Sequence, residues 1–212
     1  MTLRVLYVSE GSSDQGLRPH IERVAVEAGH EILLTAPDFA RLADHVGCAV
    51  ADKLRAAQRL GGEYDLVVVQ RDADNQGALT RRDEIAEAVA SVWPDLRHVP
   101  VVPVRALEAW LLVDEELIRQ VAGNPKGKAD LRLPRGSAVE RIADPKQCLK
   151  DALAVASDLK GRKLAVFQQR FARNRHRLLE LIDPDGPLGS IPSWQAFVED
   201  MRLAVTAAGG TR

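Results

Sequence analysis

The sequence is poor in aromatic residues and in cysteine, and it carries almost no net charge. Aromatic residues make up 4% of its 212 residues, so a core has to be built mainly from Leu, Val, Ile and Ala. The two cysteines, Cys48 and Cys148, are far apart and lack C-x-x-C spacing, which indicates neither a zinc site nor a disulfide framework. The formal net charge of −1 gives no global attraction to nucleic acid, so such binding would need a local basic patch.

Other common sequence signals are also missing. No apolar stretch approaches the roughly 20 residues that span a bilayer, and no signal-peptide pattern opens the chain, so we expect a cytoplasmic protein without membrane contact. No G-x-G-x-x-G or G-x-x-x-x-G-K-[ST] motif occurs, so neither a dinucleotide-binding fold nor a self-sufficient NTPase is indicated. The histidines form no H-E-x-x-H pair, and there is no G-x-S-x-G nucleophile elbow.

Short apolar runs alternate with helical patterns in the first half of the chain. The apolar runs predict strands at residues 2–9, 31–36, 65–70 and 98–104. The prolines of the last run place it at or near an edge of the sheet. Helices are expected at residues 16–28, 38–60, 81–92 and 105–121. This alternation predicts an α/β fold with a mostly parallel sheet flanked by helices.

The composition changes after residue 121. Residues 122–147 are rich in Gly and Pro and read as loops, and helices are expected at residues 146–159, 163–182 and 192–207. We therefore predict an α/β domain over residues 1–121 and a loop and helical C-terminal extension over residues 122–212 that packs on it.

Three carboxylates follow directly after two of the predicted strands. Glu10 comes after the first strand, and Asp72 and Asp74 come after the strand at 65–70. If these strands are neighbours in a parallel sheet, their carboxyl ends share the edge at which open α/β folds bind ligands. Carboxylates crowded there repel each other unless a hard cation neutralises them, so the pattern predicts a site for Mg²⁺ or Mn²⁺. The alternative is that both aspartates only form turns and caps.

These motifs resemble the Toprim domain, the metal-binding module of topoisomerases, primases and nucleases of the overcoming-lysogenisation-defect (OLD) class. The resemblance rests on Glu10-Gly11 at the end of the first strand and on Asp72-Ala73-Asp74 after the third. Two later segments, Leu107-Glu108-Ala109-Trp110-Leu111 and Asp144-Pro145-Lys146, look like the "LEAW" and "(N/D)PK" segments of small Toprim-like proteins of the DUF4276 type associated with phage defence. The element order agrees with a Toprim-like sheet through about residue 104.

The resemblance implies a divalent-metal-dependent nuclease. Glu10, Asp72 and Asp74 would hold the metal ions, with Glu10 as an alternative general base. Lys146 would stabilise charge on the scissile phosphate, against the default of a solvated lysine. Tyr7 and Tyr64 lie in or beside predicted strands, so neither is placed to act as the nucleophile of a topoisomerase.

Two further acidic residues have both a metal-binding and a structural interpretation. Asp14 is either an outer metal ligand or the N-cap of the helix that follows. Glu108 is either a ligand or second-layer group of the metal site, or an acidic residue that complements a helix N-terminus. Trp110 is expected in the core.

Basic residues gather in two places that suit a phosphate backbone. Arg71 adjoins the predicted metal site, so it should point away from the carboxylates or bind a phosphate. The segment from Lys160 to Arg177 contains no acidic residue. We expect its cations to contact nucleic acid, although they also suit a solvated helix face: Lys163, Arg170, Arg173, Arg175 and Arg177.

Together these features predict a nuclease that hydrolyses DNA in preference to RNA with Mg²⁺ or Mn²⁺. Because the chain lacks an ATP-binding motif, the resemblance implies a separate ABC- or SMC-type ATPase partner and an antiviral defence role, and the sequence leaves homo-oligomerisation open. One alternative is a regulatory or scaffold subunit with a structural metal. Another is a nucleotide-sugar transferase that uses Asp-x-Asp to hold a metal and a diphosphate, which gives Glu10 no role.

Overall fold

The computed structural model describes residues 2–210 of the chain. Its sheet consists of four parallel strands, β1 (Thr2–Val8), β2 (Glu31–Thr35), β3 (Leu66–Gln70) and β4 (Arg97–Val101). They lie in the order β2-β1-β3-β4. The order confirms the predicted α/β class, and β4 lies at an edge, as Pro100 within it requires.

The two central strands are buried on both faces. Every residue of β3 is buried, and β1 is buried from Val5 to its end. Such continuous apolar runs are typical of parallel strands that helices cover on both sides. One face of the sheet contributes Leu6, Val8, Val67 and Val69 to a core that also contains residues of α2 and α3.

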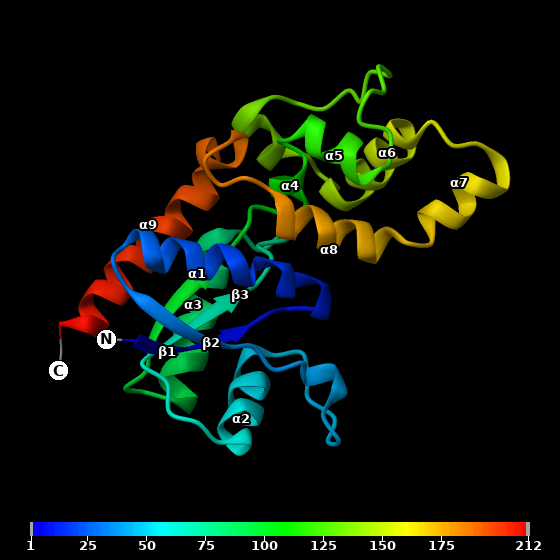
Figure 1. Cartoon of the computed structure of the whole chain (residues 1–212). Helices are drawn as coiled ribbons and strands as arrows, with labels where there is room; N and C mark the ends of the chain where they lie inside the picture. Colours follow the sequence, from blue (N-terminus) through cyan, green and yellow to red (C-terminus); the bar gives the residue numbers. More distant parts are fainter. Residues whose placement is uncertain (1, 211–212) are drawn as a thin grey trace. The chain divides into compact units, whose positions relative to one another are not determined.

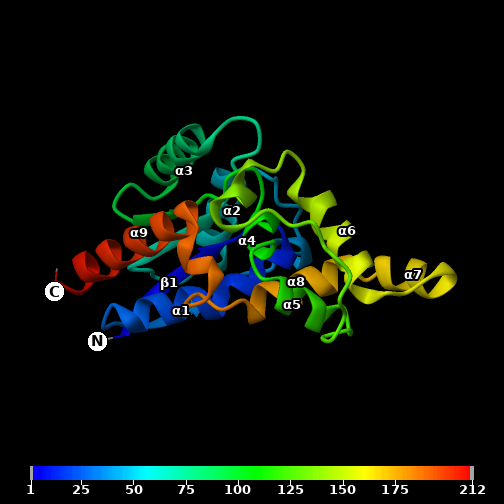
Figure 2. The ribbon, with the colours of Figure 1, turned by 90° about the horizontal axis from the view of Figure 1, so that it is seen from above.

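Helices cover this sheet on both faces. Helix α1 (Arg18–Glu27) lies on one face, and helices α2 (Val50–Leu60) and α3 (Ala78–Val92) lie on the other (Figures 1 and 2). Short 3₁₀ helices, η1 (Ser12–Leu17) and η2 (Phe39–Arg41), follow β1 and β2. The carboxyl ends of the strands therefore lead into η1, η2 and the loop before α3, which are the segments that build the candidate site.

The chain forms two compact units. The first extends to Val102 and takes in the chain again from Ala196, and the second comprises Pro103–Gln195. This division differs from the predicted one at residue 121, because the short helices that follow β4 pack against the later helices of the chain.

The second unit is helical. Its elements are α4 (Glu108–Leu111), α5 (Glu115–Val121), η3 (Gly136–Arg141), α6 (Pro145–Ser157), α7 (Gly161–Gln168), α8 (Phe171–Leu181), η4 (Pro187–Ser190) and the start of α9 (Pro192–Gly209). Trp110 is fully buried, as predicted, and stacks edge-to-face on Trp194 with ring centroids 5.3 Å apart. Its indole N–H donates to Ser193 Oγ at 2.8 Å, so the polar edge of the ring is satisfied inside the core.

Three predicted helices are shorter than expected. The helix expected at 38–60 consists of η2 and α2 only, with an irregular segment over residues 42–49. The helix expected at 105–121 is divided because Asp114 caps a new helix by accepting from Leu117 N. The helix expected at 163–182 is divided at Gln169 and Arg170 into α7 and α8.

Among residues 2–210, no helix is both long enough and apolar enough to cross a membrane.

Candidate functional site

The strand order places a topological switch point between β1 and β3. From β1 the chain first adds β2 on one side and then β3 on the other. Open α/β sheets bind ligands at the carboxyl ends of the two strands at such a point, because the connections that follow them diverge and leave a crevice. Glu10 follows the end of β1 by two residues, and Asp72 follows the end of β3 by two residues.

The structure brings Glu10 and Asp72 into contact. Glu10 Oε2 accepts a hydrogen bond from the backbone N–H of Asp72 at 2.9 Å. Gln70, the buried last residue of β3, joins the same two residues through its amide. Its Oε1 accepts from Glu10 N at 2.9 Å, and its Nε2 donates to Asp72 Oδ1 at 3.0 Å. The side-chain amide of Gln70 therefore fixes the ends of both strands relative to each other.

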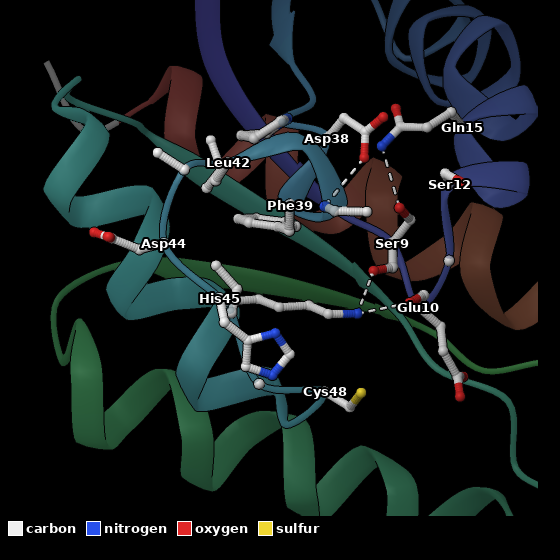
Figure 3. Close-up of a pocket in the computed structure, with 17 residues that line it drawn as sticks. Ser9, Glu10, Ser12, Gln15, Asp38, Phe39, Leu42, Asp44, His45 and Cys48 are labelled. Atoms are coloured by element: carbon white, nitrogen blue, oxygen red, sulfur yellow. Dashed lines mark hydrogen bonds between the residues drawn. The ribbon is translucent and has the colours of Figure 1, made fainter.

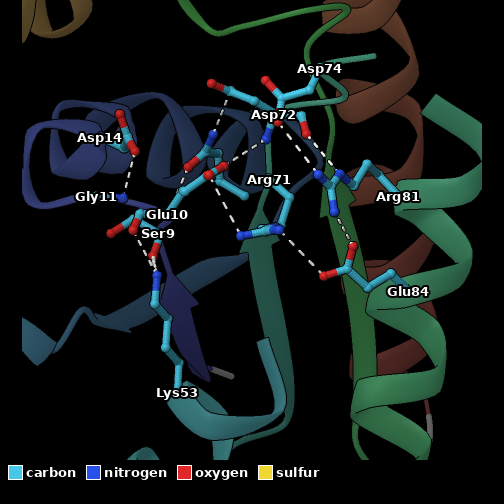
Figure 4. A network of polar contacts seen from close by, with 11 residues as sticks. Ser9, Glu10, Gly11, Asp14, Lys53, Arg71, Asp72, Asp74, Arg81 and Glu84 are labelled. Carbon is cyan, nitrogen blue, oxygen red and sulfur yellow. Dashed lines mark hydrogen bonds and ion pairs between the residues drawn. The ribbon is translucent and has the colours of Figure 1, made fainter. Parts of the chain in front are cut away.

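Two arginines supply positive charge to these carboxylates (Figure 4). Arg71 lies 3.6 Å from Glu10 Oε1 and 3.5 Å from Glu84 Oε1. Arg81 lies 3.4 Å from Asp74 Oδ2, donates to the backbone carbonyl of Asp72 at 3.1 Å, and pairs with Glu84. Arg71 thus points toward the carboxylates, in contrast to one of the two orientations considered from the sequence.

Asp74 reaches this network from a turn and not from a strand. Strand β3 ends at Gln70, so the alternation that would place Asp72 and Asp74 on one face of a strand does not apply. Between them, Ala73 is buried in the core. Asp74 has a φ of +48°, a left-handed conformation that aspartate tolerates better than most residues. Its side chain is 57% exposed and is the most accessible of the three carboxylates to an incoming ligand.

Lys53 reaches the backbone of the site from helix α2. It is a buried lysine whose Nζ donates to the backbone carbonyls of Ser9 at 2.9 Å and Glu10 at 2.7 Å. Burial lowers the pKa of Lys53, and the charge of Glu10 partly opposes that shift. Lys53 therefore fixes the backbone that carries Glu10.

Sequence reasoning missed four residues of this network: Lys53, Gln70, Arg81 and Glu84. Two of them carried a signal in the sequence. Lys53 interrupts the apolar positions of an amphipathic helix, and Gln70 ends an otherwise apolar strand. A polar side chain in a buried pattern needs a partner, so both positions marked a polar site.

The network as it stands contains no preformed metal cluster. Within residues 2–210, no three His, Cys, Asp or Glu side chains gather in a way that could hold a metal ion. The donors suit Mg²⁺ or Mn²⁺ by their chemistry, since Glu10, Asp72 and Asp74 all offer carboxylate oxygens. Arg71 and Arg81 occupy the neighbourhood of these oxygens, so a metal could bind only if those guanidinium groups moved.

Asp14 has a structural position in this arrangement. It is buried, and its Oδ2 accepts from Gly11 N at 2.8 Å at the start of η1. The backbone carbonyl of Asp14 in turn accepts from Tyr7 Oη at 3.0 Å. Gly11 is therefore the N-cap of η1, and Asp14 is the third residue of that helix, whose carboxylate caps the Gly11 N–H; it is not the N-cap that the sequence suggested.

Glu108 and Arg175 form a buried ion pair in the second unit. Arg175 Nε lies 2.8 Å from Glu108 Oε1, and the two side chains are only 7% and 5% exposed. Arg175 faces inward because it shares the buried side of α8 with Leu178 and Leu179. This placement corrects the expectation that Arg175 lies on the outer surface of its helix.

The remaining predicted cations of the second unit are on its surface. Lys146 is exposed in the first turn of α6. Lys163 on α7, Arg170 between the helices, and Arg173 and Arg177 on α8 are exposed as well. Helix α7 has no buried residue at all, so its side chains are available for external contacts.

A cavity of about 530 Å³ adjoins Glu10 in the first unit (Figure 3). One wall is the end of β1 and the start of η1, with Ser9, Glu10 and Gln15. The other is the loop between β2 and α2, with Phe39 and His45. Gln15 Nε2 donates to Ser9 Oγ at 3.1 Å, which positions the first wall.

Comparisons with models of protein families, with curated proteins and with solved structures find no match to this chain. The resemblance to Toprim proteins therefore stays a prediction from short motifs.

Proposed function

We propose that the protein is a divalent-metal-dependent phosphodiesterase that cleaves nucleic acid, DNA in preference to RNA. The observation that carries this proposal is the contact between Glu10 and Asp72 at the switch point of the sheet, where Glu10 Oε2 lies 2.9 Å from Asp72 N. Two acidic strand ends meet there beside two arginines. Carboxylates for a metal and guanidinium groups for a phosphate are the two components that phosphodiester hydrolysis needs.

The arginines are suited to exchange one anionic partner for another. Arg71 is only 14% exposed, and its Nε is buried without a hydrogen-bond partner among the described residues. Its contacts with Glu10 and Glu84 are 3.6 and 3.5 Å, longer than a good charge-assisted hydrogen bond. A phosphate would offer Arg71 shorter bidentate contacts, and the turn of Arg71 toward it would expose the carboxylate of Glu10.

In this proposal Glu10, Asp72 and Asp74 hold Mg²⁺ or Mn²⁺ once the arginines have turned to the phosphate. The bound metal would supply Lewis-acid stabilisation and a water of lowered pKa. Arg71 and Arg81 would bind and orient the phosphate and stabilise the negative charge that grows on it. Lys53 and Gln70 would keep the two strand ends in register during this exchange, because they bond to the backbone that carries Glu10 and to Asp72.

One observation favours a second candidate, a non-enzymatic scaffold subunit. The acidic edge is already neutralised by Arg71 and Arg81, so it requires no metal to be stable. In a scaffold, substitution of Asp72 and Asp74 would remove these polar contacts and lower stability together with function. In an enzyme, the same substitution would abolish turnover while the fold persists, because the metal ligands are lost but asparagine keeps a hydrogen-bond acceptor at each position.

The experiment that separates the two is cleavage of supercoiled plasmid in Mg²⁺ or Mn²⁺ by wild type and by Asp72→Asn/Asp74→Asn. We expect metal-dependent nicking by wild type, loss of nicking in the double variant, and an unchanged midpoint of thermal unfolding within a few degrees. Asp95→Asn, at an exposed position in the turn before β4, is the matched control and should nick as wild type does. Equal cleavage by wild type and the double variant would contradict the proposal.

An ATPase partner and a role in antiviral defence belong to the same proposal, and the motif resemblance alone supports them. The exposed cations of the second unit, Lys146 among them, are the candidates for contacts with the phosphates of the bound nucleic acid.

A further inference from the structure

The cavity beside Glu10 is not used by the proposed hydrolysis, and its lining differs from that of the carboxylate network. It is built from the end of β1 and from the loop before α2, and its volume of about 530 Å³ is within the usual range for small-molecule sites. Glu10 belongs to both places, since it lines the cavity and also lies against Asp72 N and Arg71. A ligand in the cavity would therefore lie next to whatever Arg71 binds.

The charges around the cavity are unfavourable to a phosphate. Its acidic residues are Glu10, Asp38 and Asp44. The ammonium group of Lys53 is directed to the carbonyls of Ser9 and Glu10, so two of its three donors are used within the protein. An uncharged group with polar edges is the better occupant, because it meets no like charge and can donate to carboxylates.

The lining instead suits a nucleobase with its sugar. Phe39 is half-buried against the core and offers an aromatic surface, and Leu42 and Val46 add apolar area. His45 and Gln15 present polar groups at the rim (Figure 3). An aromatic surface with a few polar groups is the usual way to hold an unstacked base, whatever its sequence.

We infer that this cavity binds one unstacked nucleoside of the substrate, next to the phosphate that is cleaved. The inference rests on the proposed function for the position of that phosphate. A base in a duplex is stacked and cannot enter a cavity without being extruded. Single-stranded nucleic acid is therefore the preferred substrate. A supercoiled plasmid is cleaved at sites where its strands come apart.

Binding is tested separately from cleavage, with deoxyadenosine, deoxycytidine, deoxyguanosine and thymidine as probes. Saturation-transfer NMR without metal should detect these nucleosides on wild type, and should not detect 2-deoxyribose, which lacks both the base and the phosphate that Arg71 would bind. Phe39→Leu removes the aromatic surface with a small loss of volume, and His45→Ala changes only an exposed position. Each should weaken nucleoside binding about fivefold or more. Phe167→Leu, at a half-buried phenylalanine of α7, is the matched control and should change nothing.

Cleavage gives the second readout. Wild type should cut a single-stranded oligonucleotide about tenfold faster than the same sequence in a duplex, and Phe39→Leu should reduce that ratio. The inference is overturned if wild type binds no nucleoside, if it binds 2-deoxyribose equally well, or if both cavity variants bind like wild type. Nucleoside binding without any cleavage would remove the proposed hydrolysis and leave the cavity assignment in place. Cleavage without nucleoside binding would remove the cavity assignment and leave the proposed hydrolysis in place.

Discussion

Arg71 and Arg81 determine how the acidic edge of the sheet is neutralised. A guanidinium group carries five donors in a planar fork, so it can pair with one carboxylate or with a phosphate without changing its charge. In this structure Arg71 spans Glu10 and Glu84, and Arg81 spans Asp74 and Glu84. Glu84 therefore forms an ion pair with each of the two arginines.

Replacement of Arg71 should separate phosphate binding from folding. Arg71→Gln removes a cation that lies only 3.6 Å from Glu10, and we expect the rate of plasmid nicking to fall about 10²-fold. Arg59→Gln, at an exposed position of α2, should leave the rate unchanged. Initial rates measured at saturating Mg²⁺ test this, and an unchanged rate for Arg71→Gln would exclude a role in phosphate binding.

Single residues of the site were predictable from the sequence only where they followed an apolar run. Glu10 and Asp72 stood out because an acidic residue directly after a buried strand is easy to notice. Lys53 and Gln70 lie inside apolar patterns, which mark each as a polar residue in need of a partner but do not show which partner it contacts. Arg81 lies in the first turn of a helix, and nothing in the sequence shows that it turns toward Asp72 and Asp74.

At the scale of elements, the ion pair between Glu108 and Arg175 joins α4 to α8. Both partners are buried, so removal of one leaves an unpaired charge inside the unit. We expect Glu108→Gln and Arg175→Met each to lower the free energy of unfolding by about 3–5 kcal/mol. Urea denaturation measures this difference.

The matched control replaces both members of the ion pair with apolar residues. Glu108→Leu/Arg175→Met removes both charges, and we expect its stability to lie within about 1–2 kcal/mol of wild type. If the double variant were as unstable as the single ones, the two side chains would contribute by packing and not as an ion pair.

A second element-scale prediction concerns His98 on β4, which lies near Arg82 of α3 and Asp200 of α9. Burial lowers the pKa of His98 below its ordinary value of 6.5, and Arg82 acts in the same direction while Asp200 opposes it. Asp83 and Arg97 line the same hollow. Because the folded state binds a proton less readily than the unfolded chain, His98 favours folding fully above pH 6.5 and progressively less as the pH falls toward its lowered pKa.

The free energy of unfolding should therefore decrease as the pH falls below about 6.5, with part of the slope due to His98. Urea titrations of wild type and His98→Gln over this range test the sign. A flatter dependence in His98→Gln agrees with a half-buried imidazole that is neutral in the folded state, and an identical slope would show that His98 does not contribute.

The strands were predictable because each is a short apolar run between turn signals. The helix expected at 38–60 was not, because residues 42–49 have a helical composition but contain no buried residue to hold a helix against the core. Ala49 is extended, and α2 begins only at Val50, whose side chain is buried. The division between α7 and α8 at Gln169 and Arg170 has no Gly or Pro to mark it, so local sequence could not indicate it.

At the scale of the whole molecule, charge is balanced overall but unevenly distributed. The net charge is −1, while the segment from Lys160 to Arg177, which forms α7 and most of α8, contains no acidic residue. We expect Lys163→Glu/Arg170→Glu/Arg173→Glu to weaken binding of DNA and to reduce the dependence of log K on log salt by about 0.9 for each phosphate that the variant no longer neutralises. Fluorescence anisotropy at several salt concentrations measures both quantities.

Because these positions are exposed, the triple variant should unfold within about 1 kcal/mol of wild type. Reversal of the exposed cations Arg18, Arg55 and Arg59 of the first unit is the control with the same change in net charge. If both triple variants bound DNA equally weakly, total charge and not the α7–α8 surface would govern binding.

The meeting of Glu10 with Asp72 follows from the topology of the entire sheet. The local sequence around either residue does not predict their contact, because they are 62 positions apart in the chain. The sequence could predict two acidic strand ends, and only the order β2-β1-β3-β4 makes them neighbours. The pairing of Glu10 with Arg71 and of Asp74 with Arg81 was beyond prediction, since it depends on side-chain orientation at the end of β3 and the start of α3.

The most direct test of a metal-dependent site at this edge is the rate of plasmid nicking by Asp72→Cys in Mg²⁺ and in Cd²⁺. A thiolate is a poor ligand for hard Mg²⁺ and a good one for soft cations, so a ligand position changes its metal preference with this substitution. We predict that Asp72→Cys is inactive in Mg²⁺ and regains nicking in Cd²⁺, while wild type requires Mg²⁺ or Mn²⁺. Nicking by Asp72→Cys in Mg²⁺ at the wild-type rate, or nicking by wild type in the presence of a chelator, would contradict the account.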